Sequence, residues 1–323
     1  MKNKVRQLDL FGQRDFTLAL LQIGLNAESS PLPYLNNAPL VKPYFVGERK
    51  NGVVGLYIDS AQVEWQKEEI YKRIINDSTY ISNLLSLAAT HYEKIESTLE
   101  NEVTLSRNEF KQFFDDIFIM WRWWAGWWWA VEALEHHNTH LEILEEIMTF
   151  RKKTEKAIPQ ADERIRSSVQ AIYPSIGQYA DVLLCDEILD GTLPSEKELH
   201  ERYRHSIVIG DHIYIGKQLN EALIQNGIVL AIPLPSKHKL MDNTFTGQIA
   251  FKGKCTGTVS IVLTKADANK FKEGSVLVAS QTTPDFIHAI KKAGAIVADE
   301  GGIISHASIS AREFKIPCVI GTK

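Results

Sequence analysis

Hydrophobic residues recur at helical spacing through most of the first 230 residues. The spacing of three and four predicts helices over 61–77, over 78–100 and from 107 through a tryptophan-rich stretch. Asp59 or Ser60 is placed to cap the first helix, and Ser78 the second. The pattern therefore predicts a mainly α-helical N-terminal domain.

Strand-like patterns are rarer in this region. Residues 52–59, GVVGLYID, form one short β-rich run. Residues 205–215 contain two more such runs separated by Gly210-Asp211, which predicts a hairpin. Prolines 233 and 235 lie in a stretch, 231–246, that has no helical period and reads as a linker.

After residue 245 the pattern changes to strands alternating with helices, which is typical of a small α/β domain. The expected strands are GTVSIVL, GSVLVAS, AIVAD and IPCVIG, and the expected helices are PDFIHAIKKAG and SHASISAREF. We predict an α+β multidomain protein with a helical domain at 1–230, a linker at 231–244 and a second domain at 245–323.

Composition supports an ordinary globular protein of two domains. The chain has 323 residues, of which 44% are hydrophobic and 24% charged. A net charge of −4 gives no electrostatic case for nucleic acid as a partner. The cysteines, Cys185, Cys255 and Cys318, lie far apart, which argues against a disulfide framework and fits a reducing, cytoplasmic location. The N-terminus has no apolar stretch of the kind found in a secretory signal.

One very apolar segment, residues 117–134, tests the expectation that the chain does not enter a membrane. It contains Arg122 and Glu132, and the uncharged length falls short of the roughly 20 residues that a span needs. Tryptophan also favours the membrane interface over its centre. We therefore expect no membrane span.

The stretch ADEGGIISHASISAREFKIPCVIGT, residues 298–322, carries the candidate chemistry. Gly301 and Gly302 allow a sharp turn, and Ser305 is placed as the N-cap of a helix whose first turn holds His306. A helix start suits an anion such as phosphate, and a neutral imidazole is a competent nucleophile. Local physics also fits a solvated histidine next to an N-cap, so it leaves both interpretations open.

The same stretch resembles the signature of the phosphohistidine swivelling domain of the phosphoenolpyruvate-utilising enzymes. The upstream runs GTVSIVL, FKEGSVLVASQTTPDFI and AGAIVADEGG follow the order of that family. The matching motif positions are Gly301, Gly302, Ser305, His306, Ala307, Ala311, Arg312, Glu313, Ile316, Pro317, Gly321 and Thr322.

The resemblance implies a β/β/α swivelling domain in which His306 is the phosphorylated residue. It also implies that Gly301, Gly302, Ser305 and Arg312 contact the phosphate, with Thr283 in a second phosphate-proximal segment. Domains of this family continue with further strands past the Gly-Thr pair, whereas this chain stops at Lys323. We therefore expect the domain to be trimmed or incomplete at its C-terminus.

The family also implies ATP and Mg²⁺, or phosphoenolpyruvate, as the source of the phosphoryl group. No segment has the length and β-content of an ATP-grasp module, and no GxxxxGK[ST] motif is present. We expect a donor module in cis or trans, and a small-molecule acceptor. Residues 1–240 resemble the helical region that precedes the swivelling domain in the synthase and rifampicin phosphotransferase branch. The resemblance rests on the order of the segments and on their helical pattern, not on a motif.

Two other clusters of side chains are candidates for binding. On a helix Trp121, Trp124 and Trp128 share one face, which fits either a core helix or an aromatic acceptor pocket. Glu132, His136 and His140 lie four residues apart, but a solvated helix face explains them better than a metal, so we expect no metal site.

A rival function from another class is a non-catalytic regulatory protein that uses the swivelling fold as a binding module. The lack of a charging module favours this rival, and the complete motif around His306 favours a phosphotransferase.

Overall fold

The structure is a computed structural model that describes residues 5–38, 40, 45–50, 52–101, 104–137, 141–231, 244–302 and 305–322. The chain forms two compact units. The N-terminal unit holds the residues up to Leu230 apart from Leu10–Asp15, and the C-terminal unit holds Leu10–Asp15 and the residues from Ala231 onward. Most of the predicted linker at 231–244 lies outside the described residues.

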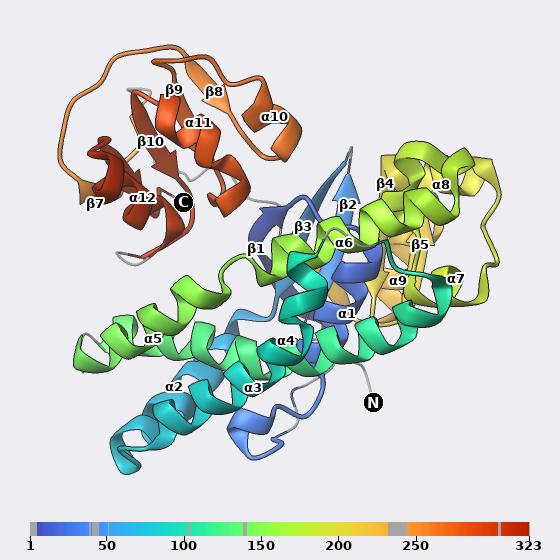
Figure 1. Ribbon diagram of the computed structural model, residues 1–323, viewed down its shortest axis with the longest axis horizontal. Coiled ribbons are helices and arrows are strands. Elements are labelled where there is room, and N and C mark those ends of the chain that lie inside the picture. Colours follow the sequence, from blue (N-terminus) through green and yellow to red (C-terminus); the bar gives the residue numbers. More distant parts are fainter. Residues whose placement is uncertain are drawn as a thin grey trace. The chain divides into compact units, whose positions relative to one another are not determined.

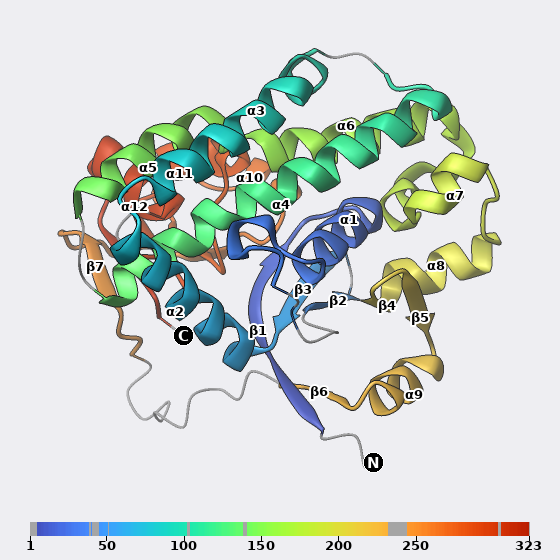
Figure 2. The same cartoon turned by 90° about the horizontal axis from the view of Figure 1, so that it is seen from below.

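Helices make up most of the N-terminal unit, and the longest of them lies at its centre. This helix, α4 (Arg107–His137), packs against α1 (Leu18–Ser29), α2 (Ser60–Asn76) and α3 (Tyr80–Glu100). Figure 2 shows α3 and α4 running side by side. The remaining helices are α5 (Leu141–Thr154), α6 (Ala157–Ile172), α7 (Cys185–Asp190), α8 (Glu196–Arg204) and α9 (Gln218–Gln225), with the 3₁₀ turns η1 (Pro33–Leu35) and η2 (Pro174–Val182).

The predicted helices are confirmed, and so is one of the two predicted caps. The Asp59 carboxylate accepts hydrogen bonds from the first backbone N–H groups of α2. Ser78 was predicted to cap α3 but does not, because α3 begins at Tyr80 and the residue at its N-cap position is Thr79. Just before α3, the Asp77 carboxylate accepts a hydrogen bond from the backbone N–H of Thr79.

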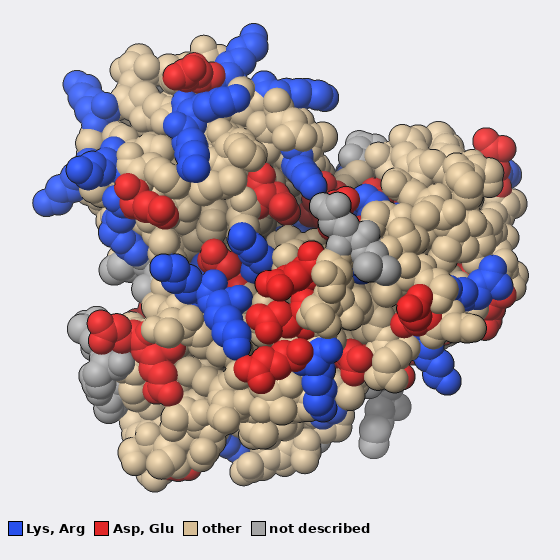
Figure 3. Space-filling model, in the orientation of Figure 1, with Lys and Arg blue, Asp and Glu red and all other residues tan. Residues whose placement is uncertain are grey.

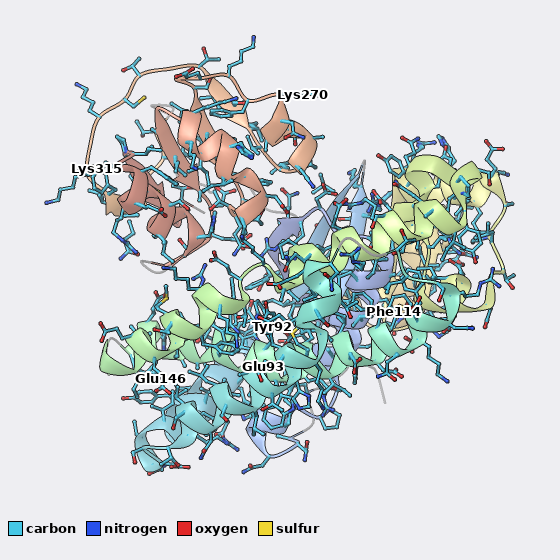
Figure 4. The ribbon with its side chains drawn as sticks, viewed as in Figure 1. Tyr92, Glu93, Phe114, Glu146, Lys270 and Lys315 are labelled. Atoms are coloured by element: carbon cyan, nitrogen blue, oxygen red, sulfur yellow. The ribbon has the colours of Figure 1, made fainter. Side chains whose placement is uncertain are left out.

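Lysine packing on an aromatic ring helps to join α3 to α5. Lys153 Nζ lies 3.0 Å from a Glu93 carboxylate oxygen and 5.9 Å from the centre of the Tyr92 ring. Figure 4 labels Tyr92 and Glu93 on α3. Tyr92 is buried and Glu93 is exposed, because α3 is amphipathic and successive residues lie on different sides of the helix.

The N-terminal unit, expected to be mainly helical with one short strand and a hairpin, also contains a six-stranded sheet. Strand β3 and the hairpin β4–β5 occur where they were predicted, but β1, β2 and β6 were not predicted. In β1 only Leu8 and Gly12 are buried, so its pattern is mostly polar, and β6, one of its two neighbours, lies at the far end of the unit in the sequence. The strands are β1 (Arg6–Arg14, of which Leu10–Arg14 belong to the C-terminal unit), β2 (Phe45–Lys50), β3 (Val53–Ile58), β4 (His205–Ile209), β5 (His212–Ile215) and β6 (Ile228–Leu230). Their order among the described residues is β5-β4-β2-β3-β1-β6.

The C-terminal unit has one five-stranded sheet within its described residues, rather than the two β layers that the β/β/α description implies (Figure 1). The order is β7-β11-β10-β9-β8, with β8 to β11 parallel and β7 antiparallel to β11. The strands are β7 (Gln248–Phe251), β8 (Val259–Ile261), β9 (Val276–Ala279), β10 (Ala295–Ala298) and β11 (Cys318–Ile320). The helices are α10 (Lys265–Asn269), α11 (Ile287–Lys292) and α12 (His306–Phe314), with the 3₁₀ turn η3 (Pro284–Phe286).

Alternate strand residues of this sheet form the core of the unit. Leu277, Ile296 and Ile320 are almost completely buried, in one cluster with Ala289 of α11 and Ala311 of α12. Successive strand side chains point to opposite faces, so the helices cover the face that carries these residues. This packing fixes where α12 begins relative to the strand ends.

Two sequence-level expectations concern the whole chain. In the part of the chain that the structure describes, no helix has the length and apolarity needed to cross a membrane. Cys185, Cys255 and Cys318, which were not expected to form a disulfide framework, are free thiols in the structure.

Candidate functional site

Polar side chains gather where three parallel strands of the C-terminal unit end. Thr282 follows β9, Asp299 and Glu300 follow β10, and Thr322 follows β11. In open α/β sheets, ligands bind outside the carboxyl ends of the strands. The helix α12 begins in the connection between β10 and β11, so its first residue belongs to the same edge.

That first residue is His306, and Ser305 is the N-cap, as the sequence predicted. Ser305 has an extended backbone, and its Oγ accepts a hydrogen bond from the Ser308 N–H at 3.3 Å. Ser305 Oγ–H donates to Ser308 Oγ, whose own hydroxyl donates to the Gly302 carbonyl at 2.8 Å. This chain of hydroxyls ties the turn before the helix to the first helical turn.

The turn depends on glycine at position 301. Gly301 has φ = +116°, a conformation that L residues rarely adopt, and a Cβ there would lie 2.6 Å from the Ser305 Cβ. Glycine therefore lets the chain fold closely over the cap. Gly302 contributes through its carbonyl oxygen, which accepts from the Ser305 N–H and from the Ser308 hydroxyl.

The imidazole of His306 is oriented by a threonine. Thr282 Oγ1 lies 3.0 Å from His306 Nδ1, and both side chains are mostly buried. In the tautomer with its proton on Nδ1, the ring donates to Thr282 and carries its lone pair on Nε2. The predicted phosphate contact, Thr283, is the next residue. It precedes the turn η3, and its side chain makes no capping hydrogen bond there.

Two carboxylates beside the turn are held by hydroxyl groups. Ser280 Oγ–H donates to Glu300 at 2.6 Å, and Thr322 Oγ1–H donates to Asp299 at 2.9 Å. The Glu300 N–H also donates to the Ser280 carbonyl, which extends the β9–β10 pairing. Sequence reasoning missed Ser280, Thr282 and these acids. Their position directly after parallel strands was the signal that would have found them.

Arg312, also predicted to contact phosphate, lies in the last turn of α12 and is exposed. It stands six residues after His306, a rise of about 9 Å along the helix. Its charge acts locally on Cys318, whose thiol pKa is raised to about 11 by burial and lowered in part by Arg312. The structure thus gathers Gly301, Gly302 and Ser305 around His306 and sets Arg312 apart.

In the N-terminal unit, the tryptophans of α4 surround a buried acid. The indole N–H groups of Trp121 and Trp129 donate to the two carboxylate oxygens of Glu28, at 3.2 and 3.3 Å. Burial raises the pKa of Glu28 to about 7, and the two indole hydrogen bonds lower it in part. Sequence reasoning did not find Glu28, because nothing in α1 marks it as a partner of α4.

The predicted aromatic face is assembled in part. Trp124 and Trp128 have ring centres 6.1 Å apart at an interplanar angle of 25°, and both are partly buried, like Trp121. Trp127 and Trp129, on the other faces, are 1% and 2% exposed and belong to the core. Trp121 turns toward Glu28, so the stacked pair is Trp124 with Trp128.

Comparison with known proteins concerns the C-terminal unit. The family described as "PEP-utilising enzyme, mobile domain" matches residues 271–323. Over 74 residues, or 23% of this chain, phosphoenolpyruvate synthase of Pyrococcus furiosus is 49% identical and probable phosphoenolpyruvate synthase of Archaeoglobus fulgidus 45% identical. An uncharacterized phosphotransferase of Bacillus subtilis, YvkC, is 42% identical over 85 residues, or 26% of this chain.

The matched part spans about a tenth of the length of these relatives, at 9%, 10% and 10%. It includes the turn, the cap and the helix that hold His306. The chain therefore carries, at residues 271–323, a mobile domain of the PEP-utilising enzyme family.

Proposed function

We propose that this protein is a phosphotransferase component in which His306 carries a phosphoryl group from a donor to an acceptor. The observation that carries the proposal is the position of His306 at the first residue of α12, with Nδ1 against Thr282 Oγ1 at 3.0 Å. A ring held in this way directs its other nitrogen, Nε2, to the incoming phosphorus atom. The names of the relatives, phosphoenolpyruvate synthases and a phosphotransferase, support the same class of reaction.

The proposed transfer has two steps. Nε2 attacks the phosphorus atom, an N–P bond forms and the P–O bond to the donor breaks, so the donor leaves with the electron pair. In the second step an acceptor oxygen attacks, the N–P bond breaks and the neutral imidazole returns. Positioning and charge stabilisation are the protein's main contributions to such a transfer. The positive end of α12 and the turn at Gly301 and Gly302 supply them.

The donor is proposed to be ATP with Mg²⁺, or phosphoenolpyruvate, bound by a module in cis or trans. The acceptor is proposed to be a small molecule that binds the N-terminal unit at the aromatic face of Trp121, Trp124 and Trp128. Stacked indoles bind flat, apolar ligands well. We propose that the protein acts in the cytoplasm, where its free thiols persist.

The test is phosphohistidine mapping by mass spectrometry after incubation with each donor and a charging module from a related enzyme. We expect label on His306 and none in His306→Ala. The matched control is His288→Ala, which removes an exposed histidine of α11 in the same unit and should leave labelling unchanged. Label that persists in His306→Ala would overturn the assignment. No label in the unmodified chain with either donor would favour the regulatory alternative.

A further inference from the structure

Three side chains that could bind a metal ion converge in the N-terminal unit, whereas His306 belongs to the C-terminal unit. Glu68 comes from α2, and His136 and His137 are the last two residues of α4. One ligand atom of each lies within 4.8 Å of the others. Glu68 Oε1 is 3.0 Å from His137 Nε2 and 3.9 Å from His136 Nδ1.

The packing of α2 against α4 brings these residues together and orients them. The His137 ring stacks on Tyr71, one turn after Glu68 on α2, with ring centres 3.7 Å apart at 8°. The two imidazoles are close, with centres 5.0 Å apart, and nearly perpendicular. One ligand is thus fixed by stacking, and a metal site profits from ligands that are oriented before the ion binds.

The neighbouring charges have other partners. Lys67 Nζ lies 3.0 Å from Glu64 and 3.9 Å from Glu132, and Lys72 lies 2.8 Å from Glu69. Glu132, which the sequence grouped with His136, therefore pairs with a lysine instead, and His140 lies outside the described residues. The carboxylate that meets the histidines is Glu68, from a helix far away in the sequence.

We propose that Glu68, His136 and His137 form a binding site for a late first-row divalent metal ion, with Zn²⁺ the best fit. Zinc accepts imidazole nitrogens together with a carboxylate oxygen, and the two imidazoles disfavour Mg²⁺ or Ca²⁺, which prefer oxygen ligands. Ligand atoms at about 2.1 Å from one tetrahedral ion are roughly 3.4 Å apart, between the observed 3.0 and 3.9 Å. Water completes the coordination, and the ion fastens the end of α4 to α2.

The test is a titration of the full chain with Zn²⁺, followed by calorimetry, and with Co²⁺, followed by its visible absorption. We expect one site, a higher melting temperature with Zn²⁺, and affinity at least about tenfold weaker in Glu68→Gln and His137→Ala, because even changes around metal ligands cost that much. Glu68→Gln is the sharper variant, since the amide keeps a hydrogen-bond acceptor for His137 but loses the charge.

The matched controls are Glu69→Gln, the next residue of α2, whose carboxylate pairs with Lys72 and Arg73, and His212→Ala, an exposed histidine on β5. Both should bind Zn²⁺ like the unmodified chain. His306→Ala should also bind it normally, which separates this site from the proposed carrier histidine. No Zn²⁺ binding, or equal affinity in Glu68→Gln and His137→Ala, would overturn the proposal.

Discussion

The hydroxyl of Thr282 determines which nitrogen of His306 is presented for chemistry. Replacing Thr282 by valine keeps the shape but removes the atom 3.0 Å from Nδ1. We expect phosphorylation of His306 to slow by between about tenfold and a hundredfold, because a small misplacement of a reacting group has costs of that order. Rapid-quench labelling with a charging module would measure the rate.

Thr258→Val is the control, since it makes the same chemical change at an exposed threonine of the same unit. Its labelling rate should stay close to that of the unmodified protein. If the two variants slowed equally, the hydrogen bond from His306 Nδ1–H to Thr282 Oγ1 would not be the cause. Thr282 and Thr283 are adjacent residues of the same type, so the sequence alone did not show which of them contacts His306.

The buried carboxyl of Glu28 should make the stability of the folded chain depend on pH. Its pKa in the folded chain, about 7, is higher than the ordinary value of 4.5, because the carboxyl is buried. The folded state therefore binds this proton more tightly, and the resulting stability is present below pH 4.5 and lost as pH rises through 7. Between pH 5 and pH 8 the loss amounts to about 2–3 kcal/mol.

Glu28→Gln cannot ionise and should escape this loss. Urea unfolding at pH 5 and pH 8 would show the variant gaining about 2–3 kcal/mol relative to the unmodified protein as pH rises. Asp162, whose burial raises its pKa to about 6, leaves a smaller slope of the same sign in both proteins. Parallel stability curves for the two proteins would contradict the prediction.

At the scale of elements, the turn into α12 is built around one glycine. Gly301→Ala places a Cβ 2.6 Å from Ser305 at φ = +116°, so either the turn or the cap must move. We expect a cost of about 1–3 kcal/mol, concentrated in α12. Hydrogen exchange of the α12 amides, read by mass spectrometry, should accelerate, and His306 labelling should fall.

Gly274→Ala is a fitting comparison in the same unit. Gly274 also has a positive φ, +77°, but a Cβ there would meet no atom within 4 Å. Its replacement should cost about 1 kcal/mol without affecting exchange in α12. Equal acceleration of α12 in both variants would mean that contact with Ser305 has no special role.

An element could be predicted from the sequence when its own residues carry a burial pattern, and could not when it depends on packing partners far away in the sequence. The helices α2, α3 and α4 each bury one face or more, and their periodicity is visible in the sequence. Strand β1 buries only Leu8 and Gly12, so its sequence has no strand pattern. The metal-ligand set was not predictable either, since Glu68 meets His136 and His137 only through the packing of α2 on α4.

At the scale of the whole molecule, charge is divided unevenly along the chain. Residues 244–323 contain ten Lys and Arg against six Asp and Glu, whereas the whole chain has a net charge of −4. Figure 3 shows Lys and Arg side chains projecting from the C-terminal unit, and Figure 4 labels Lys270 and Lys315 there. A basic carrier attracts an anionic donor site, so its docking should weaken with salt.

The isolated chain should not be able to charge His306 by itself. We expect no stable label on His306 with γ-labelled ATP and Mg²⁺ alone, because phosphoryl transfer needs cations held around the nucleotide in a dedicated cleft. Label should appear when an ATP-grasp module from a related enzyme is added, and its rate should fall as salt is raised. Stable labelling of the isolated chain would show that it binds the nucleotide itself.

The pairing of β1 with β6 also bears on how the protein emerges from the ribosome. Arg6 lies beside Ile228, so the sheet of the N-terminal unit is complete only after residue 228 has been synthesised. In the C-terminal unit, by contrast, β8, β9 and β10 pair in the order of synthesis. Folding slows as contacts span longer stretches of chain, and unpaired strands invite aggregation. The nascent first strand can pair with β3 early, but its other edge stays unpaired until β6 has been made, and chaperones have their longest opportunity to bind at that edge.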